Sequence, residues 1–188
     1  MRIKPTAIPG RLVLELSRRD TSLLAEASGD PLPKPRCLQL SRILVPVDFS
    51  DCSKKALRYA VAFARQFRAS LSLLYVVQVN FTGGECGPID ITPIERELRQ
   101  QGEQRLAELL ESETDPEIPV EIAVRTGHPA QQIVAAAKQS EIDLIIMSTH
   151  GYTGLKHMLL GSTSESVVRS APCPVLVVRE HEHEFVTN

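Results

Sequence analysis

Aromatic residues are scarce in this chain: they make up 4% of its 188 residues, and tryptophan is absent. A hydrophobic core must therefore be built from Val, Ile, Leu and Ala, the residues that fill parallel sheets covered on both faces. Long apolar runs are missing as well, since no stretch of the sequence approaches the roughly 20 residues that a membrane-spanning helix needs. We therefore expect a parallel α/β protein with no membrane partner.

An excess of one charge is also missing. The 21 Lys and Arg residues against 23 Asp and Glu leave a formal net charge of -2, so the charge does not favour nucleic acid or an anionic membrane as a partner. The cysteines, Cys37, Cys52, Cys86 and Cys173, contain no C-x-x-C pair, which disfavours a zinc site and a disulfide framework. The apolar stretch at residues 12–14 is too short for a secretory signal. We expect a reduced, cytoplasmic protein.

The composition changes near residue 41. Residues 1–36 hold five of the 13 prolines and seven basic against four acidic residues, and a Pro-x-Pro-x-Pro stretch at 31–35 cannot continue a helix. The pattern at residues 11–17 is too brief to separate a strand from a helix. We expect residues 1–40 to be a Pro-rich extension, residues 41–180 a single domain, and residues 181–188 a polar tail.

Strand and helix patterns alternate through the predicted domain. Apolar β-branched runs predict strands at residues 43–47, 71–79, 120–124, 144–147 and 175–178. Helical spacing predicts four helices. The first follows a cap at Ser50 or Ser53, and the second opens with a capping box at Thr92. The other two are predicted at residues 130–139 and 164–170. Five strands joined by helical crossovers predict an α/β fold: one doubly wound, five-stranded parallel sheet with helices on both faces.

Ligands of such sheets lie beyond the carboxyl ends of the strands. Two segments follow strand ends, Pro46-Val47-Asp48 and the glycine-rich stretch 148–166. Glycines let backbone amides approach an anion, and a helix that starts at Gly161 would point unpaired amides at a phosphate. The stretch could equally be a glycine-rich connector with a serine cap, and Asp48 could simply cap the helix that follows it.

Known phosphate-binding loops do not account for this stretch. The chain has no G-x-x-x-x-G-K-[ST] motif and no G-x-G-x-x-G after a strand, which disfavours a Walker-type NTPase and a dinucleotide enzyme. His150 and His157 lack a third ligand nearby in the sequence, and residues 181–184 are interpreted as a solvated tail, so no metal site is predicted. Arg96, Arg99, Glu103 and Arg105 are expected to be exposed on the polar face of their helix.

Three motifs in order resemble the nucleotide-binding branch of the universal stress protein family. The family's glycine signature, G-x2-G-x9-G-[ST], is similar to Ser148-Thr-His-Gly151, nine residues, and Gly161-Ser162. The opening Ile43-Leu-Val-Pro-Val-Asp48-Phe-Ser50 and the closing Ala171-Pro-Cys-Pro-Val-Leu-Val-Val-Arg179 resemble the family as well. The resemblance covers about residues 41–180.

The resemblance implies strand order 3-2-1-4-5 and an ATP, with Mg²⁺ or Mn²⁺, at the switch between the first and fourth strands. It assigns the adenosine end to Pro46, Val47, Asp48 and Val76. It assigns the phosphates to Ser148, Thr149, His150, Gly151, Tyr152, Thr153, Gly154, Gly161, Ser162, Thr163 and Ser164. It also implies a homodimer through Val175–Val178, because an apolar edge strand needs a partner.

Two residues depart from the family pattern. Ser148 replaces the first glycine, and Tyr152 stands where relatives often carry Arg or Lys, so both changes weaken the expected affinity for ATP. No nucleophile–base pair indicates a catalytic centre, which leaves slow ATP hydrolysis at most. The resemblance implies a cytoplasmic, dimeric, ATP-binding stress sensor or regulator; the alternative is a relative that has lost nucleotide binding and acts as a protein-interaction module.

Overall fold

The computed structural model describes residues 2–5, 12–15, 38–78, 92–149, 161–181 and 186. The chain divides into two compact units, Met1–Leu38 and Gln39–Asn188. In the first unit, β1 (Arg2–Pro5) pairs antiparallel with β2 (Leu12–Glu15). The segment that the sequence left open between strand and helix is therefore a strand, and its sheet is separate from that of the second unit.

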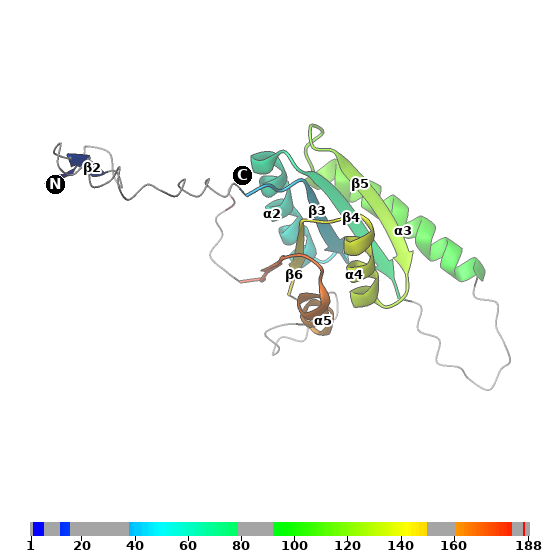
Figure 1. Cartoon of the computed structure of the whole chain (residues 1–188). Helices are drawn as coiled ribbons and strands as arrows, with labels where there is room; N and C mark the ends of the chain where they lie inside the picture. The colour runs from blue at the N-terminus through cyan, green and yellow to red at the C-terminus, as the bar shows by residue number, and fades with distance from the viewer. Residues whose placement is uncertain are drawn as a thin grey trace. The chain divides into compact units, whose positions relative to one another are not determined.

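The second unit is built on a five-stranded parallel sheet (Figure 1). Its strands are β3 (Arg42–Val47), β4 (Ser70–Val77), β5 (Val120–Thr126), β6 (Leu144–Ser148) and β7 (Val175–Val178). They lie in the order β5-β4-β3-β6-β7. Counted from β3, this is the order 3-2-1-4-5, so the predicted topology is confirmed.

Helices cover both faces of the sheet, as predicted. They are α2 (Asp51–Phe67), α3 (Thr92–Glu113), α4 (Pro129–Gln139) and α5 (Ser162–Ser170). The buried side chains of α2 and α3 pack in one hydrophobic cluster, and those of α4 and α5 pack in the other. The last helix begins at Ser162 with Gly161 as its N-cap. This agrees with the start at Gly161 that the phosphate-site interpretation needs, and it lies two residues before the helical pattern at 164–170.

The core explains why the strands read as continuous apolar runs. Along β3, Ile43 and Val45 belong to the cluster under α2 and α3, whereas Leu44 between them belongs to the cluster under α4 and α5. All three are at most 2% exposed. Burying one such side chain stabilises the fold by about 1.5–3 kcal/mol. A strand that is apolar on both sides therefore gains this stabilisation from both hydrophobic clusters.

Helix α3 is attached more sparsely than the others. Of its 22 residues only Gly102, Leu106 and Leu109 are buried. At Gly102 the helix lies so close to β4 that a Cβ atom would stand 2.7 Å from the Tyr75 ring. This glycine therefore serves close packing rather than a turn. Among the described residues, no helix is both long and apolar enough to cross a membrane.

The end of the chain returns to the core. Lys55 on α2 is buried, and its Nζ donates a hydrogen bond to the carbonyl oxygen of Glu180 at 3.2 Å. Val186, further along, packs against the cluster under α2 and α3. The segment expected to be a polar tail thus contributes one apolar side chain to the domain.

Two of the cysteines, Cys52 and Cys173, are half-buried, and the other two lie outside the described residues. Burial raises the pKa of the Cys173 thiol, and the nearby Asp143 carboxylate raises it further. Cys173 therefore stays protonated at neutral pH, which suits its packing against the hydrophobic cluster under α4 and α5.

A larger side chain at Gly102 should loosen α3. We predict that Gly102→Val lowers the free energy of unfolding by about 1–3 kcal/mol, because the new methyl groups overlap the Tyr75 ring. Gln100→Val is the matched control: it introduces the same residue on the exposed face of the same helix and should cost less than about 1 kcal/mol. Urea unfolding of both variants measures the difference, and equal stabilities would contradict the packing argument.

Removing residues 1–38 should leave the second unit folded. All the strands of its sheet, the four helices α2 to α5 and both hydrophobic clusters lie after residue 38. We expect the truncated chain to keep a cooperative thermal transition within a few degrees of that of the full chain. A transition that disappears on truncation would show that the first unit contributes to the core.

Candidate functional site

A cavity of about 540 Å³ opens where β3, β4 and β6 end. It lies at the topological switch, since β3 and β6 are neighbours whose following helices cover opposite faces of the sheet. The predicted site residues that line this cavity are Pro46, Val47, Asp48, Val76, Ser148, Thr149, Gly161, Ser162, Thr163 and Ser164. The structure thus brings together residues that are more than a hundred positions apart in the sequence.

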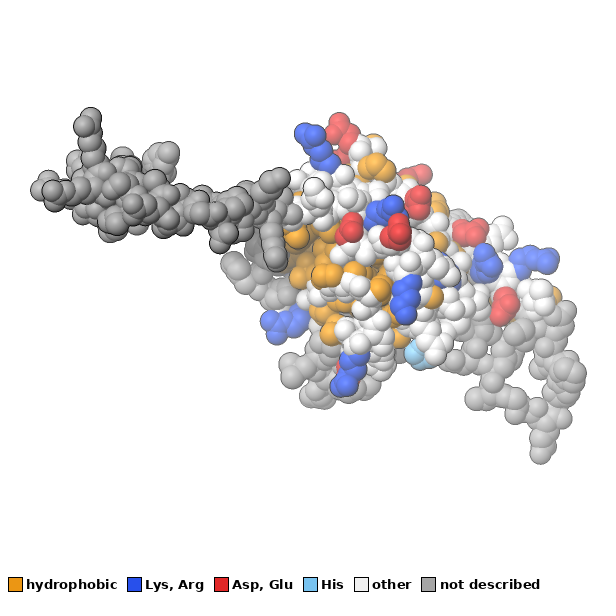
Figure 2. All heavy atoms as spheres, viewed as in Figure 1, with side chains coloured by type: hydrophobic (Ala, Val, Ile, Leu, Met, Phe, Trp, Pro, Cys, Tyr) orange, Lys and Arg blue, Asp and Glu red, His pale blue; other side chains and the backbone are white. Residues whose placement is uncertain are grey.

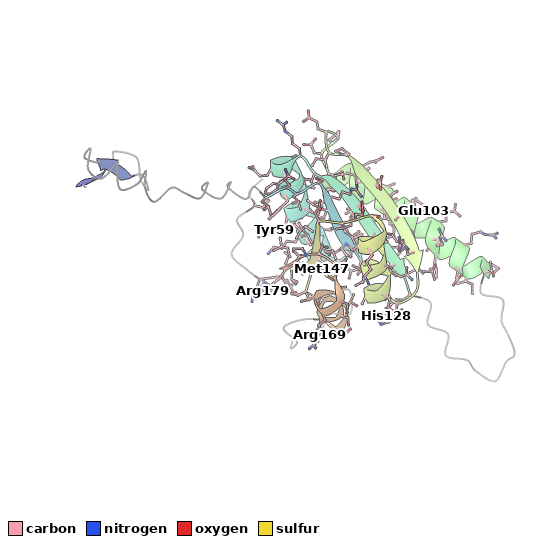
Figure 3. The ribbon with its side chains drawn as sticks, in the orientation of Figure 1. Tyr59, Glu103, His128, Met147, Arg169 and Arg179 are labelled. Atoms are coloured by element: carbon pink, nitrogen blue, oxygen red, sulfur yellow. The ribbon has the colours of Figure 1, made fainter. Side chains whose placement is uncertain are left out.

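The remaining predicted residues, His150, Gly151, Tyr152, Thr153 and Gly154, lie outside the described residues. The cavity also has lining residues that the sequence did not indicate: Leu74, Tyr75, Gln78, Arg105, Pro129, Ile133 and Met147. Met147 lies near the end of β6, and Figure 3 shows it between the two helix layers. In the sequence, the apolar lining residues cannot be distinguished from ordinary core residues. Arg105 is exposed, as expected, and yet it faces the cavity.

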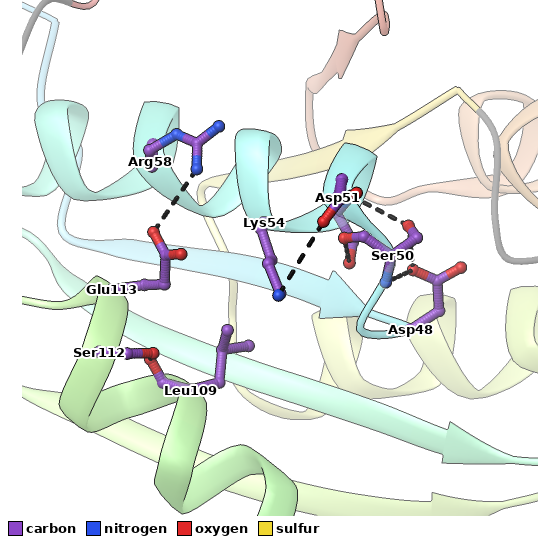
Figure 4. Close-up of polar contacts among 9 residues, drawn as sticks. Asp48, Ser50, Asp51, Lys54, Arg58, Leu109, Ser112 and Glu113 are labelled. Carbon is purple, nitrogen blue, oxygen red and sulfur yellow. Dashed lines mark hydrogen bonds and ion pairs between the residues drawn. The ribbon is translucent and has the colours of Figure 1, made fainter.

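Asp48 is fixed by the first turn of α2 (Figure 4). Its Oδ1 accepts hydrogen bonds from the backbone N–H of Ser50 at 3.1 Å and from the Ser50 hydroxyl at 2.6 Å. The Ser50 Oγ in turn accepts from the backbone N–H of Ser53 at 3.2 Å and is the N-cap of the helix. The cap is therefore Ser50, while Asp48 orients Ser50 and lines the cavity.

The N-terminus of α5 forms the opposite wall. Gly161 is the N-cap with φ -71, so it does not depend on the left-handed region. The first amides of a helix, here those of Ser162, Thr163 and Ser164, have no acceptor within the helix and carry partial positive charge. All three residues line the cavity. This wall is suited to an anion.

The carbonyl of Thr149 holds that helix end against the sheet. It accepts hydrogen bonds from the backbone N–H of Gly161 at 2.8 Å and from the hydroxyl of Ser164 at 3.0 Å. The Thr149 N–H donates to the carbonyl of Val178 on β7 at 2.9 Å. Because the buried Ser164 hydroxyl is used in this way, only the hydroxyls of Ser162 and Thr163 remain of the three that were predicted to face a phosphate.

On the other side of the cavity, the lining residues Tyr75 and Arg105 both contact Phe49, which is not itself a lining residue. Phe49 takes a left-handed backbone conformation with φ 66, and its ring centroid lies 4.8 Å from that of Tyr75. The Cζ atom of Arg105 lies 3.9 Å from the centre of the Phe49 ring. This side therefore combines apolar surface, the Asp48 carboxylate and one guanidinium group.

The site has the parts of an anion-binding wall and of a mixed polar and aromatic wall, but no cluster of metal ligands. Among the described residues, no three His, Cys, Asp or Glu side chains lie together so that they could hold a metal ion. The arrangement can bind a molecule that is negatively charged at one end and flat at the other.

Comparison with known proteins agrees with this fold. A model of the universal stress protein family matches residues 40–179. Universal stress protein MJ0531 of Methanocaldococcus jannaschii is 34% identical over 143 residues, covering 76% of this chain and 84% of the relative. The solved structure of MJ0577, from the same archaeon, matches with a TM-score of 0.65 and 28% identity over 78% of this chain and 100% of its own.

A universal stress protein from Archaeoglobus fulgidus, solved in complex with dAMP, has the same fold. Its TM-score is 0.51 at 20% identity, over 75% of this chain and 99% of its own. The family model spans the whole five-stranded sheet, and the strand order is the one that the motifs imply. The chain belongs to the universal stress protein family.

Proposed function

We propose that this protein binds ATP in the cavity between β3 and β6 and acts as a dimeric, cytoplasmic stress sensor or regulator. The adenosine lies against Pro46, Val47, Asp48 and Val76, and the phosphates lie against the N-terminus of α5. The observation that carries the proposal is that Asp48 and the first residues of α5 line one cavity.

Chemistry at the two ends of the cavity supports this orientation. Polyphosphate carries the ligand's negative charge, and helix N-termini bind phosphate through unpaired amides and the helix dipole. A carboxylate at the other end would repel phosphate but can accept hydrogen bonds from ribose hydroxyls or an exocyclic amine. The same fold holds an adenine nucleotide, dAMP, in the Archaeoglobus fulgidus protein.

The departures found in the sequence act on the phosphate end. Ser148 is half-buried at the end of β6 and lines the cavity. The position thus lacks the backbone freedom of a glycine and offers a hydroxyl group instead. Tyr152 lies outside the described residues. The proposal therefore depends mainly on the amides of α5.

A divalent cation, Mg²⁺ or Mn²⁺, fits this proposal as the counter-ion of the triphosphate. Such ions are commonly held by substrate phosphates together with few protein groups and several waters. The described part of the cavity offers hydroxyl oxygens from Ser162 and Thr163 near the phosphate end. When bound, the ion would neutralise phosphate charge. The protein's own residues would bind and orient the nucleotide.

The alternative is a protein-interaction module that has lost nucleotide binding. Catalysis is not part of the proposal beyond slow hydrolysis, because the polar side chains of the described cavity include one carboxylate and no His or Cys that could act as a nucleophile or base beside it. A titration with ATP separates the two functions, since the interaction module would not bind the nucleotide.

Dimerisation through β7 completes the proposal. β7 ends the sheet, and Val175, Leu176 and Val177 on it are only half-buried. Figure 2 shows hydrophobic side chains at the surface in the part of the domain where β6 lies, next to this edge. An apolar edge strand promotes aggregation unless it is paired, so a second copy is the partner that we propose for it.

A branched side chain at Gly161 should obstruct the phosphate site. We predict that Gly161→Val weakens ATP binding by roughly a hundredfold or more, because two or three charge-assisted hydrogen bonds are lost. The fold should survive, since Gly161 has a negative φ that valine can adopt. Calorimetric titration with ATP measures the change. Ser166→Val, exposed on the same helix and outside the cavity, is the control and should bind ATP like the wild type.

Asp48 should act on the choice of base. Asp48→Asn keeps an acceptor for the Ser50 hydroxyl. We predict that it lowers the ratio of ATP affinity to GTP affinity by a larger factor than it lowers the affinity for nucleoside triphosphates in general. Titrations with ATP and GTP give both numbers. If the wild type binds neither nucleotide, or Gly161→Val binds ATP as tightly as the wild type does, the interaction module replaces the ATP-binding proposal.

A charge on the β7 edge should separate the dimer. We expect Val177→Arg to give a monomer, because two like charges would meet across the paired edges. Ile122→Arg places the same charge on β5, the opposite edge of the sheet, and should leave the dimer intact. Light scattering at micromolar concentration measures the mass. A wild-type monomer, or dissociation by both substitutions alike, would contradict pairing through β7.

A further inference from the structure

Arg105 combines three properties that its sequence context hides. It belongs to α3, where it was expected to be exposed like the other arginines of that helix, and it lines the cavity. Its guanidinium carbon lies 3.9 Å from the centre of the Phe49 ring, which is stacking distance. Among residues 38–78, 92–149 and 161–181, no carboxylate lies within ion-pair distance of it.

The packing of α3 determines where Arg105 lies. Gly102 is one turn earlier on the same side of the helix and lies against the Tyr75 ring with no room for a side chain. Tyr75 in turn packs against Phe49. Tyr75 therefore contacts both the helix that carries Arg105 and the Phe49 ring on which Arg105 lies.

The left-handed conformation of Phe49 is part of this arrangement. A non-glycine residue with φ 66 is uncommon, and an aromatic one is disfavoured unless its surroundings hold it there. Here the side chain of Phe49 is held between Tyr75 and Arg105. One face of the guanidinium is covered by the ring, while the residue still borders the cavity.

We propose that Arg105 covers the purine base of the bound nucleotide, stacking on it as Phe49 stacks on Arg105. The inference rests on the proposed function, because it assigns a role within the same cavity. A guanidinium group is planar and weakly hydrated, and it stacks on bases as well as on aromatic rings. Phe49 restricts its motion in advance, so less conformational entropy is lost when the base arrives.

The position of Arg105 indicates the base rather than the phosphates. Arg105 contacts Phe49, which follows β3, and Phe49 contacts Tyr75 on β4. The phosphate wall follows β6, which lies on the other side of β3 in the sheet. The guanidinium therefore borders the half of the cavity that holds Asp48 and Val76, where the nucleoside is proposed to lie.

The test compares ATP with tripolyphosphate, which has the same kind of anionic chain and no base. We expect Arg105→Met and Arg105→Lys each to weaken ATP binding by about tenfold, since both lose the planar group that stacks on the base. Binding of tripolyphosphate, measured by competition with ATP, should change less than twofold. Arg99→Met removes the same charge from the same helix away from the cavity and should leave both affinities unchanged.

A second variant tests the supporting ring. Phe49→Leu keeps an apolar side chain in the same backbone conformation and removes the surface beneath the guanidinium, so ATP should bind several-fold more weakly with tripolyphosphate unaffected. If Arg105→Lys keeps wild-type affinity while Arg105→Met weakens both ligands, Arg105 acts as a general charge and the inference is wrong. If every variant binds ATP like the wild type, it is also wrong. A wild type that binds neither ligand would instead overturn the proposed function.

Discussion

The position of the α5 N-terminus at the cavity depends on one backbone carbonyl, that of Thr149. It accepts from Gly161 and from the Ser164 hydroxyl, and the N–H of the same residue donates to β7. A single buried residue thereby joins the end of β6, the start of α5 and the last strand. The direction of the α5 amides follows from this junction, because the helix cannot rotate away from the strand end without leaving buried polar groups unpaired.

Parallel strand order then places that wall opposite Asp48. β3 and β6 are neighbours, but the helices that follow them, α2 and α5, pack on different faces of the sheet. A crevice between two strand ends is expected at such a switch in strand order. Asp48 is held by Ser50 at the start of α2, and the first residues of α5 are held by Thr149. Both walls of the cavity thus lie at helix N-termini: that of α2 is capped by the Ser50 side chain, and that of α5 has no side-chain cap and is anchored to the sheet through Thr149.

The sequence predicted the sheet well, because strands buried on both faces leave continuous apolar runs with β-branched residues. It also indicated Asp48 and Gly161, which belong to motifs at strand ends. It could not indicate Arg105, since a polar helix gives no sign of which arginine turns toward a cavity. Gly102 carries a signal in the sequence, because a glycine inside a helical pattern often has a packing reason. The use of the Ser164 hydroxyl depends on a contact across fifteen residues, which spacing alone does not show.

The sparse attachment of α3 has a kinetic consequence. Elements with few buried side chains open at a lower free energy than the strands beneath them, and their amides exchange with solvent sooner. Because only three residues of α3 are buried, we expect this helix to open at a lower free energy than the sheet and the other helices. Arg105 would leave the cavity together with it. The rates of ligand entry and exit would then be limited by local opening of this one helix and not by unfolding of the domain.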